Sequence, residues 1–247
     1  MYLCRRIVNF EVIHIDETDS TNRWLRDYVC HNGITSAPIV TWAEYQTAGK
    51  GCGTNSWESE RGKNLTFSVL LHPEGLPANC QFFISEVVSV ALCETLETYI
   101  YNKVEIKWPN DIYVGDRKIC GMLIENRLQG SVIKDSIVGI GLNVNQTVFH
   151  SDAPNPVSLY QITGHELDRE EILNDFMGRL TQKLQSETIP ADYHSRLYRR
   201  EGLFCFKDAT GSFMAEIADV LEDGHLVLTD EGGRVRTYAF KEIQFII

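Results

Sequence analysis

The sequence lacks several features that mark common protein classes. No apolar run approaches the length needed to span a bilayer, and no long apolar segment follows the basic residues at the start of the chain. The 7 cysteines are scattered without a Cys-x-x-Cys pair, and the 7 histidines form neither His-x-x-x-His nor His-x-x-Glu-His. These absences exclude a spanning helix, a disulfide framework and a standard zinc site. They predict a cytoplasmic protein whose cysteines are reduced and mostly buried.

The chain is also short of positive charge. Its 23 Lys and Arg residues are outnumbered by 34 Asp and Glu residues, so the formal net charge is −11. Such a balance disfavours non-specific attraction to nucleic acid or to an anionic membrane. With 247 residues and 43% hydrophobic content, the chain is long enough to bury a sizeable core. We expect a soluble globular protein with no nucleic-acid and no membrane partner.

Hydrophobic periodicity predicts alternating strands and helices over the first hundred residues. Strands are predicted at 10–15, 38–45 and 64–71, the last of them half-buried. The spacing of Trp24, Leu25, Tyr28 and Val29 predicts a helix that follows the polar residues 19–22. The stretch 79–101 has no breaking residue and predicts a long helix with apolar residues on more than one face.

The chain is organised around the stretch 104–121. A short strand brings Lys107, Pro109 ends its hydrogen-bond ladder, and Asn110 and Asp111 follow where the backbone turns. A second polar turn carries Lys118, ahead of strands predicted at 119–126 and 131–141. We expect the two lysines at the ends of neighbouring strands, where they suit an anionic ligand such as a carboxylate plus a phosphate. An ordinary hairpin with solvated lysines is the alternative.

The last hundred residues change character twice. A loop at 151–156 precedes helices predicted at 168–185 and 191–200. From Gly202 onward, short strands and the turn signals Asp223-Gly224 and Gly232-Gly233 predict a small β-barrel of about five strands. We therefore predict two domains, residues 1–200 and residues 201–247.

Small polar residues gather at the first strand-to-helix junction. Ser20, Thr21 and Asn22 stand there together, although one of them would suffice to cap the helix. Three neighbouring hydrogen-bonding side chains also suit a polar ligand pocket.

Glycines gather in two further places. In the loop from Gln46 to Trp57, three alternating glycines surround Lys50, so backbone N–H groups can approach a phosphate. The spacing is neither that of a Walker loop nor that of a dinucleotide-binding fingerprint. Trp57 either covers a ligand or anchors the loop. The run 139–145 has two glycines that allow close approach of a backbone or ligand, and its Asn143 and Asn145 suit either a binding role or an Asx turn.

Taken together and in this order, the glycine-rich loop, Lys107-Trp108-Pro109-Asn110-Asp111 and Gly139-Ile140-Gly141-Leu142-Asn143-Val144-Asn145 resemble biotin–protein ligases. The resemblance runs from about Phe10 to the C-terminus, and the Lys107–Asp111 motif is its most specific part. It implies an α+β fold with helices packed on a mixed, largely antiparallel sheet, plus a small SH3-like C-terminal barrel. The first predicted strand begins almost at once, so we expect the ligase-only form without an N-terminal DNA-binding domain.

The resemblance implies a reaction in two steps. The carboxylate of biotin attacks the α-phosphate of ATP with Mg2+ to give biotinyl-5′-AMP and pyrophosphate. A lysine of a biotin carboxyl carrier protein then attacks the mixed anhydride and releases AMP. Two anions must meet in the first step, so cations and backbone donors are required and no protein nucleophile is needed.

The resemblance also implies roles for individual residues. Ser20, Thr21, Asn22 and Gln46 are expected at biotin, Lys50, Gly51 and Cys52 on the closing loop, and Trp57 by the adenine. Lys118 is expected at the biotin carboxylate and acyl phosphate, Lys107 at the phosphates, and Gly121 downstream in the same motif. Asn110, Asp111 and Asn143 are expected near the adenylate and metal, with Asp111 as the metal ligand.

One departure from the family pattern concerns the loop. The usual Gly-Arg-Gly-Arg-x-Gly-Arg reads Gly49-Lys50-Gly51-Cys52-Gly53-Thr54-Asn55 here, so one arginine is a lysine and two cations are missing. We expect weaker retention of the adenylate than in an arginine-bearing relative, and a slow off-rate would contradict this. Cys52 is expected to be a passive thiol, since Lys50 is the one cation expected nearby.

Two alternatives compete with a biotin ligase. A lipoate or octanoate ligase or transferase shares the fold but centres on other motifs. A non-catalytic biotin-binding scaffold has little use for two lysines at an anhydride. Members of the family are monomers or homodimers joined at the sheet edge, and the sequence does not decide between them.

Overall fold

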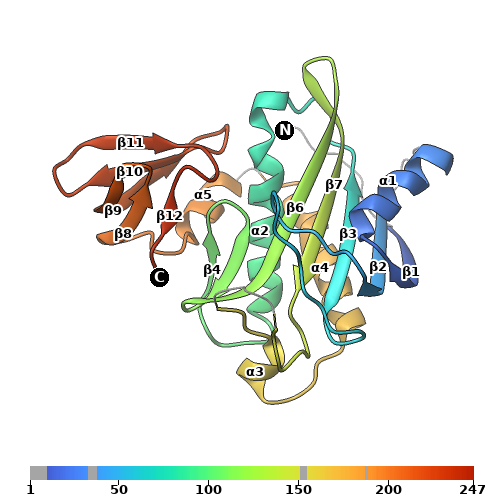
Figure 1. The fold of residues 1–247 in the computed structure, drawn as a ribbon. Coiled ribbons are helices and arrows are strands. Elements are labelled where there is room, and N and C mark those ends of the chain that lie inside the picture. Colours follow the sequence, from blue (N-terminus) through green and yellow to red (C-terminus); the bar gives the residue numbers. More distant parts are fainter. Residues whose placement is uncertain (1–9, 33–37, 151–154, 187–188) are drawn as a thin grey trace.

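The computed structural model describes residues 10–32, 38–150, 155–186 and 189–247. A seven-stranded sheet has the order β1-β2-β3-β7-β6-β5-β4, and only β1 and β2 pair in parallel (Figure 1). Its strands are β1 (Glu11–Thr18), β2 (Ile39–Gln46), β3 (Leu65–Leu71), β4 (Val104–Lys107), β5 (Asp111–Val114), β6 (Arg117–Gln129) and β7 (Val132–Leu142). The predicted mixed, largely antiparallel sheet is therefore confirmed.

Helices cover both faces of this sheet. Helix α1 (Thr21–Asn32) lies over β2, β3 and β7, where Leu25 and Val29 pack on Leu70 and Ile137. On the other face lie α2 (Phe82–Leu96) and α4 (Arg169–Lys183), with the larger hydrophobic core beneath them. Two short helices, α3 (Leu159–Thr163) and α5 (Ile189–Ser195), complete this part of the fold.

Strand β3 differs from the prediction. It was expected to be half-buried, but all seven of its residues are buried. The polar face that carries Thr66 and Ser68 is covered by α1 and not by solvent. The hydroxyl of Thr66 donates to the carbonyl of Ala43 in β2, and that of Ser68 donates to Thr21 in α1. The sequence of β3 still alternates polar and apolar residues, although both faces of the strand are covered.

The predicted helices are shorter than expected. The stretch 79–101 forms a 3-10 turn (Ala78–Cys80) followed by α2, which ends at Leu96. The stretch 191–200 is helical only up to Ser195, because residues 196–198 run beside β4 and exchange backbone hydrogen bonds with Ile106. Helix α3 was not predicted.

The two motif lysines do not lie on neighbouring strands. Lys107 ends β4 and Lys118 begins β6, and β5 lies between those strands. Across β4 and β5 Lys107 pairs with Asp111, whereas across β5 and β6 Lys118 pairs with Tyr113. The prediction of adjacent strands was wrong, because residues 111–114 form a strand of their own.

The C-terminal segment forms a second antiparallel sheet in the order β11-β10-β9-β8-β12. Its strands are β8 (Phe204–Asp208), β9 (Gly211–Val220), β10 (Leu226–Asp230), β11 (Val235–Tyr238) and β12 (Gln244–Phe245). Five short strands fit the predicted small β domain. Figure 1 shows this sheet beside β4, at the opposite side of the molecule from α1.

The second sheet packs firmly on the rest of the molecule. The indole Nε1 of Trp108 donates a 2.9 Å hydrogen bond to the carbonyl of Gly224, and its ring meets Phe240 edge-on. Buried residues from both sheets belong to one hydrophobic cluster. The predicted boundary near residue 200 stays a prediction.

The cysteines follow the prediction in part. All six that lie in the described ranges are free, but only Cys93 and Cys120 are buried. Cys30 is exposed on α1, and the other three are partly exposed. Among the described residues, no helix has the length and hydropathy to cross a membrane.

Candidate active site

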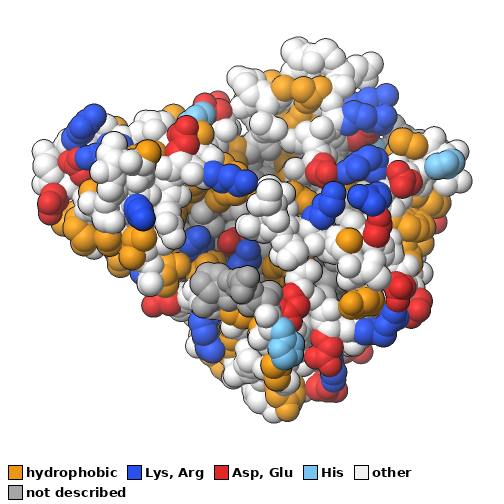
Figure 2. Space-filling view, in the orientation of Figure 1, with side chains coloured by type: hydrophobic (Ala, Val, Ile, Leu, Met, Phe, Trp, Pro, Cys, Tyr) orange, Lys and Arg blue, Asp and Glu red, His pale blue; other side chains and the backbone are white. Residues whose placement is uncertain are grey.

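A pocket of about 1310 Å³ lies on the side of the large sheet that carries α1. It is lined by residues from the segment 46–58, from β4 to β7 and from the C-terminal segment 240–247. Figure 2 shows the molecule hollowed between the C-terminal sheet and the main body, with Lys or Arg atoms at the edge of the hollow. All fourteen residues predicted from the sequence for the site line this pocket, so residues more than 120 positions apart meet there.

One end of the pocket is neutral, buried and rich in hydrogen bonds; we call it the polar end. Gln46 accepts hydrogen bonds through Oε1 from the backbone N of Thr21 at 2.8 Å and from its hydroxyl at 3.2 Å. Ser68 Oγ lies 2.8 Å from Thr21 Oγ1 and 2.6 Å from Asn22 Oδ1. Thr21 and Asn22 are therefore held by partners across the sheet. The hydroxyl of Ser20 forms no hydrogen bond with any described residue and lines the pocket.

Asn22 is fixed on both sides. Its amide nitrogen donates to the carbonyl of Leu123 and, at 2.8 Å, to the carboxylate of Glu125. Its oxygen faces Gly139, where an added Cβ would lie only 2.3 Å from Oδ1. The close approach predicted for the glycines of β7 is thus made here by a side chain.

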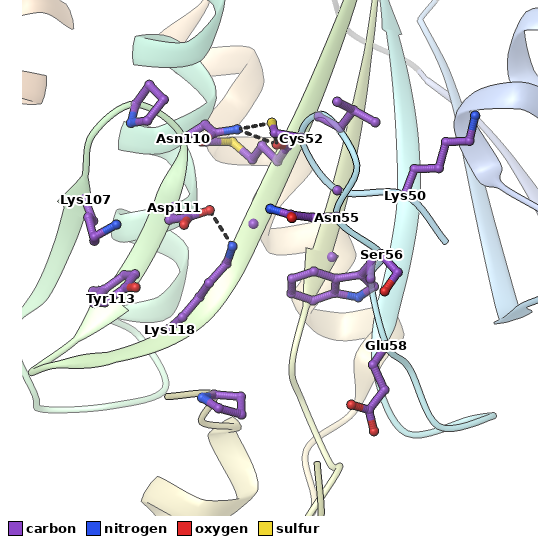
Figure 3. Close-up of a pocket in the computed structure, with 18 of the residues that line it drawn as sticks. Lys50, Cys52, Asn55, Ser56, Glu58, Lys107, Asn110, Asp111, Tyr113 and Lys118 are labelled. Carbon is purple, nitrogen blue, oxygen red and sulfur yellow. Dashed lines mark hydrogen bonds and ion pairs between the residues drawn. The ribbon is translucent and has the colours of Figure 1, made fainter. Parts of the chain in front are cut away.

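The other end of the pocket is charged; we call it the cationic end. Lys118 Nζ lies 2.6 Å from Asp111 Oδ1, and both side chains are mostly buried (Figure 3). The backbone of Lys118 is fixed as well, because its N–H donates to the carbonyl of Asn155 and its carbonyl accepts from Val157. Both members of the ion pair are therefore carried by strands, Asp111 by β5 and Lys118 by β6.

Lys107 lies beside this pair but in no ion pair with a described residue. Its ammonium group sits 5.4 Å from the ring centre of Tyr113 and 5.0 Å from that of Phe245. Burial lowers the pKa of Lys107, Asp111 opposes that shift, and the charges of Lys118 and Arg199 add to it. A poorly hydrated cation without a full counter-charge is suited to receive an anion.

The glycine-rich loop is tied to the sheet through Cys52 and Asn110. The amide nitrogen of Asn110 lies 3.0 Å from Cys52 Sγ and donates to the carbonyl of Met122 at 2.6 Å. Burial raises the pKa of the Cys52 thiol, which fits the passive thiol predicted for it. The cations that counter this rise are Lys118 and Lys241, and not Lys50 as the sequence suggested.

The loop also pairs with itself. The N–H of Gly51 donates to the carbonyl of Asn55 at 2.8 Å, and the N–H of Trp57 donates to the carbonyl of Gly49 at 3.0 Å. The backbone donor of Gly51 expected at a phosphate is therefore used within the loop. Figure 3 shows Lys50 directed away from Asp111 and Lys118, whereas Asn55 is directed toward them.

Trp57 packs against two glycines of the sheet. A Cβ at Gly141 would lie 2.2 Å from its indole, and one at Gly121 would lie 3.1 Å from it. Lys118 Nζ sits 5.7 Å from the indole ring centre, and the indole Nε1 is buried with no hydrogen-bond partner among the described residues. The indole therefore anchors the glycine-rich loop on the sheet and also forms a wall of the cationic end.

The two asparagines after β7 take different parts. Asn143 is buried at the pocket wall, where its amide donates to the carbonyl of Val157 at 3.1 Å. Asn145 exchanges two hydrogen bonds with the backbone of Leu167 and does not line the pocket. Asn145 therefore has neither of the roles suggested for it: it lies outside the pocket lining, and its bonds to Leu167 are not an Asx turn.

Two residues of the pocket region that sequence reasoning missed bear on its chemistry. Ser68 organises the polar end from beneath, and its signal was a hydroxyl on the polar face of a strand. Lys241 lines the cationic side and comes from the C-terminal segment. No local pattern marks it, since only the packing of the second sheet brings it to the loop.

A metal ion would find few protein ligands here. Asp111 is a carboxylate at the cationic end, and the described residues hold no group of three or more His, Cys, Asp or Glu side chains arranged for a metal. Mg2+ bound to nucleotides commonly takes one or two carboxylates and completes its shell with phosphates and water. The donor set fits such an ion and does not fit a site built from protein alone.

Comparisons with known proteins point to one family. Residues 15–143 match the biotin/lipoate A/B protein ligase family. The bifunctional ligase/repressor BirA of Salmonella typhimurium is 32% identical over 187 residues, 75% of this chain and 53% of that protein. This chain thus spans about half the length of that relative. The biotin–[acetyl-CoA-carboxylase] ligase of Mycobacterium tuberculosis is 25% identical over 229 residues, 89% of this chain and 83% of that protein.

A solved structure extends the likeness to the whole fold. The biotin protein ligase from Aquifex aeolicus in complex with biotin and ATP superposes with a TM-score of 0.75 at 26% identity. The superposition covers 95% of this chain and 97% of that one, including the C-terminal sheet. Because the family match takes in just over half of the residues and the solved relative matches the rest, this chain belongs to the biotin/lipoate A/B protein ligase family.

Proposed function

We propose that this protein is an ATP-dependent biotin–protein ligase. It would join biotin to a lysine of a biotin carboxyl carrier protein in the cytoplasm, through biotinyl-5′-AMP. The observation that carries the proposal is that one pocket has a neutral polar end and a cationic end, the two environments that biotin and a nucleotide triphosphate require. The ligand pair named for the Aquifex aeolicus structure, biotin and ATP, supports it.

The polar end suits the ureido group of biotin. A ureido group offers N–H donors and a carbonyl acceptor, and it meets fixed hydroxyls and amides around Thr21, Asn22 and Gln46. Because these groups are already held by Ser68 and Glu125, they need little reordering when the ligand binds. The free hydroxyl of Ser20 is a further donor or acceptor at this end.

The cationic end suits the first chemical step. A carboxylate oxygen of biotin attacks the α-phosphorus of ATP, and the bond to the pyrophosphate oxygen breaks. Both reactants are anions, so they repel each other until cations offset the charge. Lys118 would orient the carboxylate, and the partly buried Lys107 would receive the phosphates in a setting where charges interact more strongly than in water.

The second step needs a nucleophile from the partner. The amine of the carrier lysine attacks the carbonyl carbon of the anhydride, and AMP leaves. Lys118, near the same carbonyl, would stabilise the oxygen that gains charge. Asp111 would hold Mg2+ when it is bound with the nucleotide, and the ion would neutralise phosphate charge.

A lipoate or octanoate ligase is the alternative within the family. Its acyl chain has no ureido group, so it would occupy the polar end without offering a hydrogen-bond partner to the unpaired hydroxyl of Ser20. This feature favours biotin. A binding scaffold without turnover would not use the Lys107 and Lys118 pair.

ATP–pyrophosphate exchange tests the proposal. Wild type, Lys118→Ala and Lys134→Ala should be compared with biotin, lipoate and octanoate as the acid. Lys134 is exposed on β7 outside the pocket, so its variant controls for the loss of one positive charge. We expect exchange with biotin alone, reduced about 100-fold or more in Lys118→Ala and unchanged in Lys134→Ala.

Other outcomes would overturn parts of the proposal. Exchange with lipoate or octanoate in place of biotin would move the protein to the sister activity. Biotin binding without any exchange would favour the scaffold. Incubation with a biotin carboxyl carrier domain, ATP and biotin then tests the transfer step, which should leave one biotin on one carrier lysine.

A further inference from the structure

Lys241 lies where the C-terminal sheet meets the glycine-rich loop. It follows β11 in the chain and lines the same pocket as Lys107 and Lys118. Its Nζ sits against Gly53 in the loop, so close that a Cβ added to Gly53 would lie 1.9 Å from it. The absence of a side chain at Gly53 is what leaves room for the ammonium group.

The backbone of Lys241 is in a conformation that lysine rarely adopts. Its φ is 72°, in the left-handed region, which glycine occupies without strain. Among the described residues only Arg199 shares this property without being glycine, with φ 58°. An unfavourable backbone conformation kept by a charged residue at a pocket points to a function for its side chain.

Arg199 helps to fix the segment that carries Lys241. It donates a 2.7 Å hydrogen bond to the carbonyl of Ile246, next to β12. The ring of Phe245 lies over Lys107, so the same segment closes the pocket beside the motif lysine. Figure 1 shows the end of the chain close to β4. The residues that follow Lys241 are thus held against the end of β4.

The charge of Lys241 is available to a ligand. No described carboxylate forms an ion pair with it, whereas Lys118 is paired with Asp111. The loop beside it supplies little charge of its own, because Lys50 points away and positions 52 and 55 are Cys and Asn. Lys241 therefore brings a positive charge to the loop in which Cys52 and Asn55 replace the arginines of the family pattern.

We propose that Lys241 is a nucleotide-positioning residue that contacts the phosphates and provides the charge that the glycine-rich loop lacks. The inference rests on the proposed function. It makes the C-terminal sheet a direct contributor to the ligand site, and it counters the weak adenylate retention expected from the loop sequence alone.

The test uses the full chain with Lys241→Gly, Lys241→Arg and Lys134→Ala. Calorimetric titration would measure affinity for biotin, and then affinity for ATP in the biotin-bound protein with Mg2+ omitted so that turnover is suppressed. We expect Lys241→Gly to bind ATP about 10-fold more weakly, with biotin affinity unchanged. Lys241→Arg should remain within a few-fold of wild type, and Lys134→Ala should match it.

Thermal unfolding separates this role from a structural one. Glycine relieves the left-handed strain at position 241, so Lys241→Gly should have an equal or higher Tm despite its weaker ATP binding. Equal ATP affinity in wild type and Lys241→Gly would overturn the inference, as would a joint loss of Tm, biotin binding and ATP binding. Failure of the wild type to bind biotin or ATP would instead overturn the proposed function.

Discussion

At the residue scale, the polar end of the pocket depends on hydroxyl and amide groups that satisfy one another. Ser68 is fully buried and serves both Thr21 and Asn22, although it does not line the pocket itself. Its neighbour across the strand pair, Thr41, is equally buried, but its hydroxyl has no partner among the described residues. The hydroxyl of Ser68 therefore stabilises the fold through its hydrogen bonds, whereas burial of the Thr41 hydroxyl costs free energy.

This contrast gives a prediction. Ser68→Ala should lower the free energy of unfolding by about 1–3 kcal/mol, because Thr21 and Asn22 lose a buried partner. It should also raise the KM for biotin in the exchange assay. The matched control Thr41→Val removes a hydroxyl without a partner and should be neutral or stabilising. Denaturant unfolding measures both, and equal destabilisation by the two variants would contradict the assignment.

At the element scale, α2 carries a buried acidic residue against the second sheet. Glu86 is 6% exposed, and burial, with a contribution from the charge of Glu222, raises its pKa from 4.5 to about 7. The folded protein therefore holds this proton more tightly than the unfolded chain does. The stabilisation is complete below about pH 4.5 and is lost as the pH rises through about 7.

The free energy of unfolding should therefore depend on pH through Glu86, and replacing Glu86 should remove this dependence. Glu86→Gln should raise the free energy of unfolding by about 2–3 kcal/mol at pH 8 and have little effect at pH 5. Glu222→Gln removes only the repelling charge, so it should act in the same direction by less. Urea unfolding of the three proteins between pH 5 and 8 measures this, and a pH-independent difference would contradict it.

At the scale of the whole molecule, Trp108 joins the central motif to the C-terminal sheet. Trp108→Phe keeps an aromatic ring but removes the hydrogen bond to Gly224, at a cost of about 1 kcal/mol in the free energy of unfolding. If the sheet carries Lys241 to the loop, the variant should also raise the KM for ATP more than the KM for biotin. Trp24→Phe, on α1, should change neither.

The sequence was sufficient for most strands because apolar alternation has a local cause. It did not reveal that β3 is covered on both faces, since a serine facing solvent and Ser68 facing α1 follow the same pattern. It also misplaced Lys107 and Lys118, because β5 is only four residues long and reads as a turn. Helix α3 has five residues, too few for a periodic signal.

By itself, the sequence predicted most of the strands and the longer helices, the family resemblance and fourteen of the residues that line the pocket. These follow from periodicity and from motifs that are contiguous in the chain. Only the tertiary structure decided which groups touch: the Ser68 bridge at the polar end, the Lys118–Asp111 pair, and the approach of Lys241 to Gly53. The reason is physical, because these contacts join segments that are distant in sequence, and their geometry is set by sheet register and by packing between the two sheets.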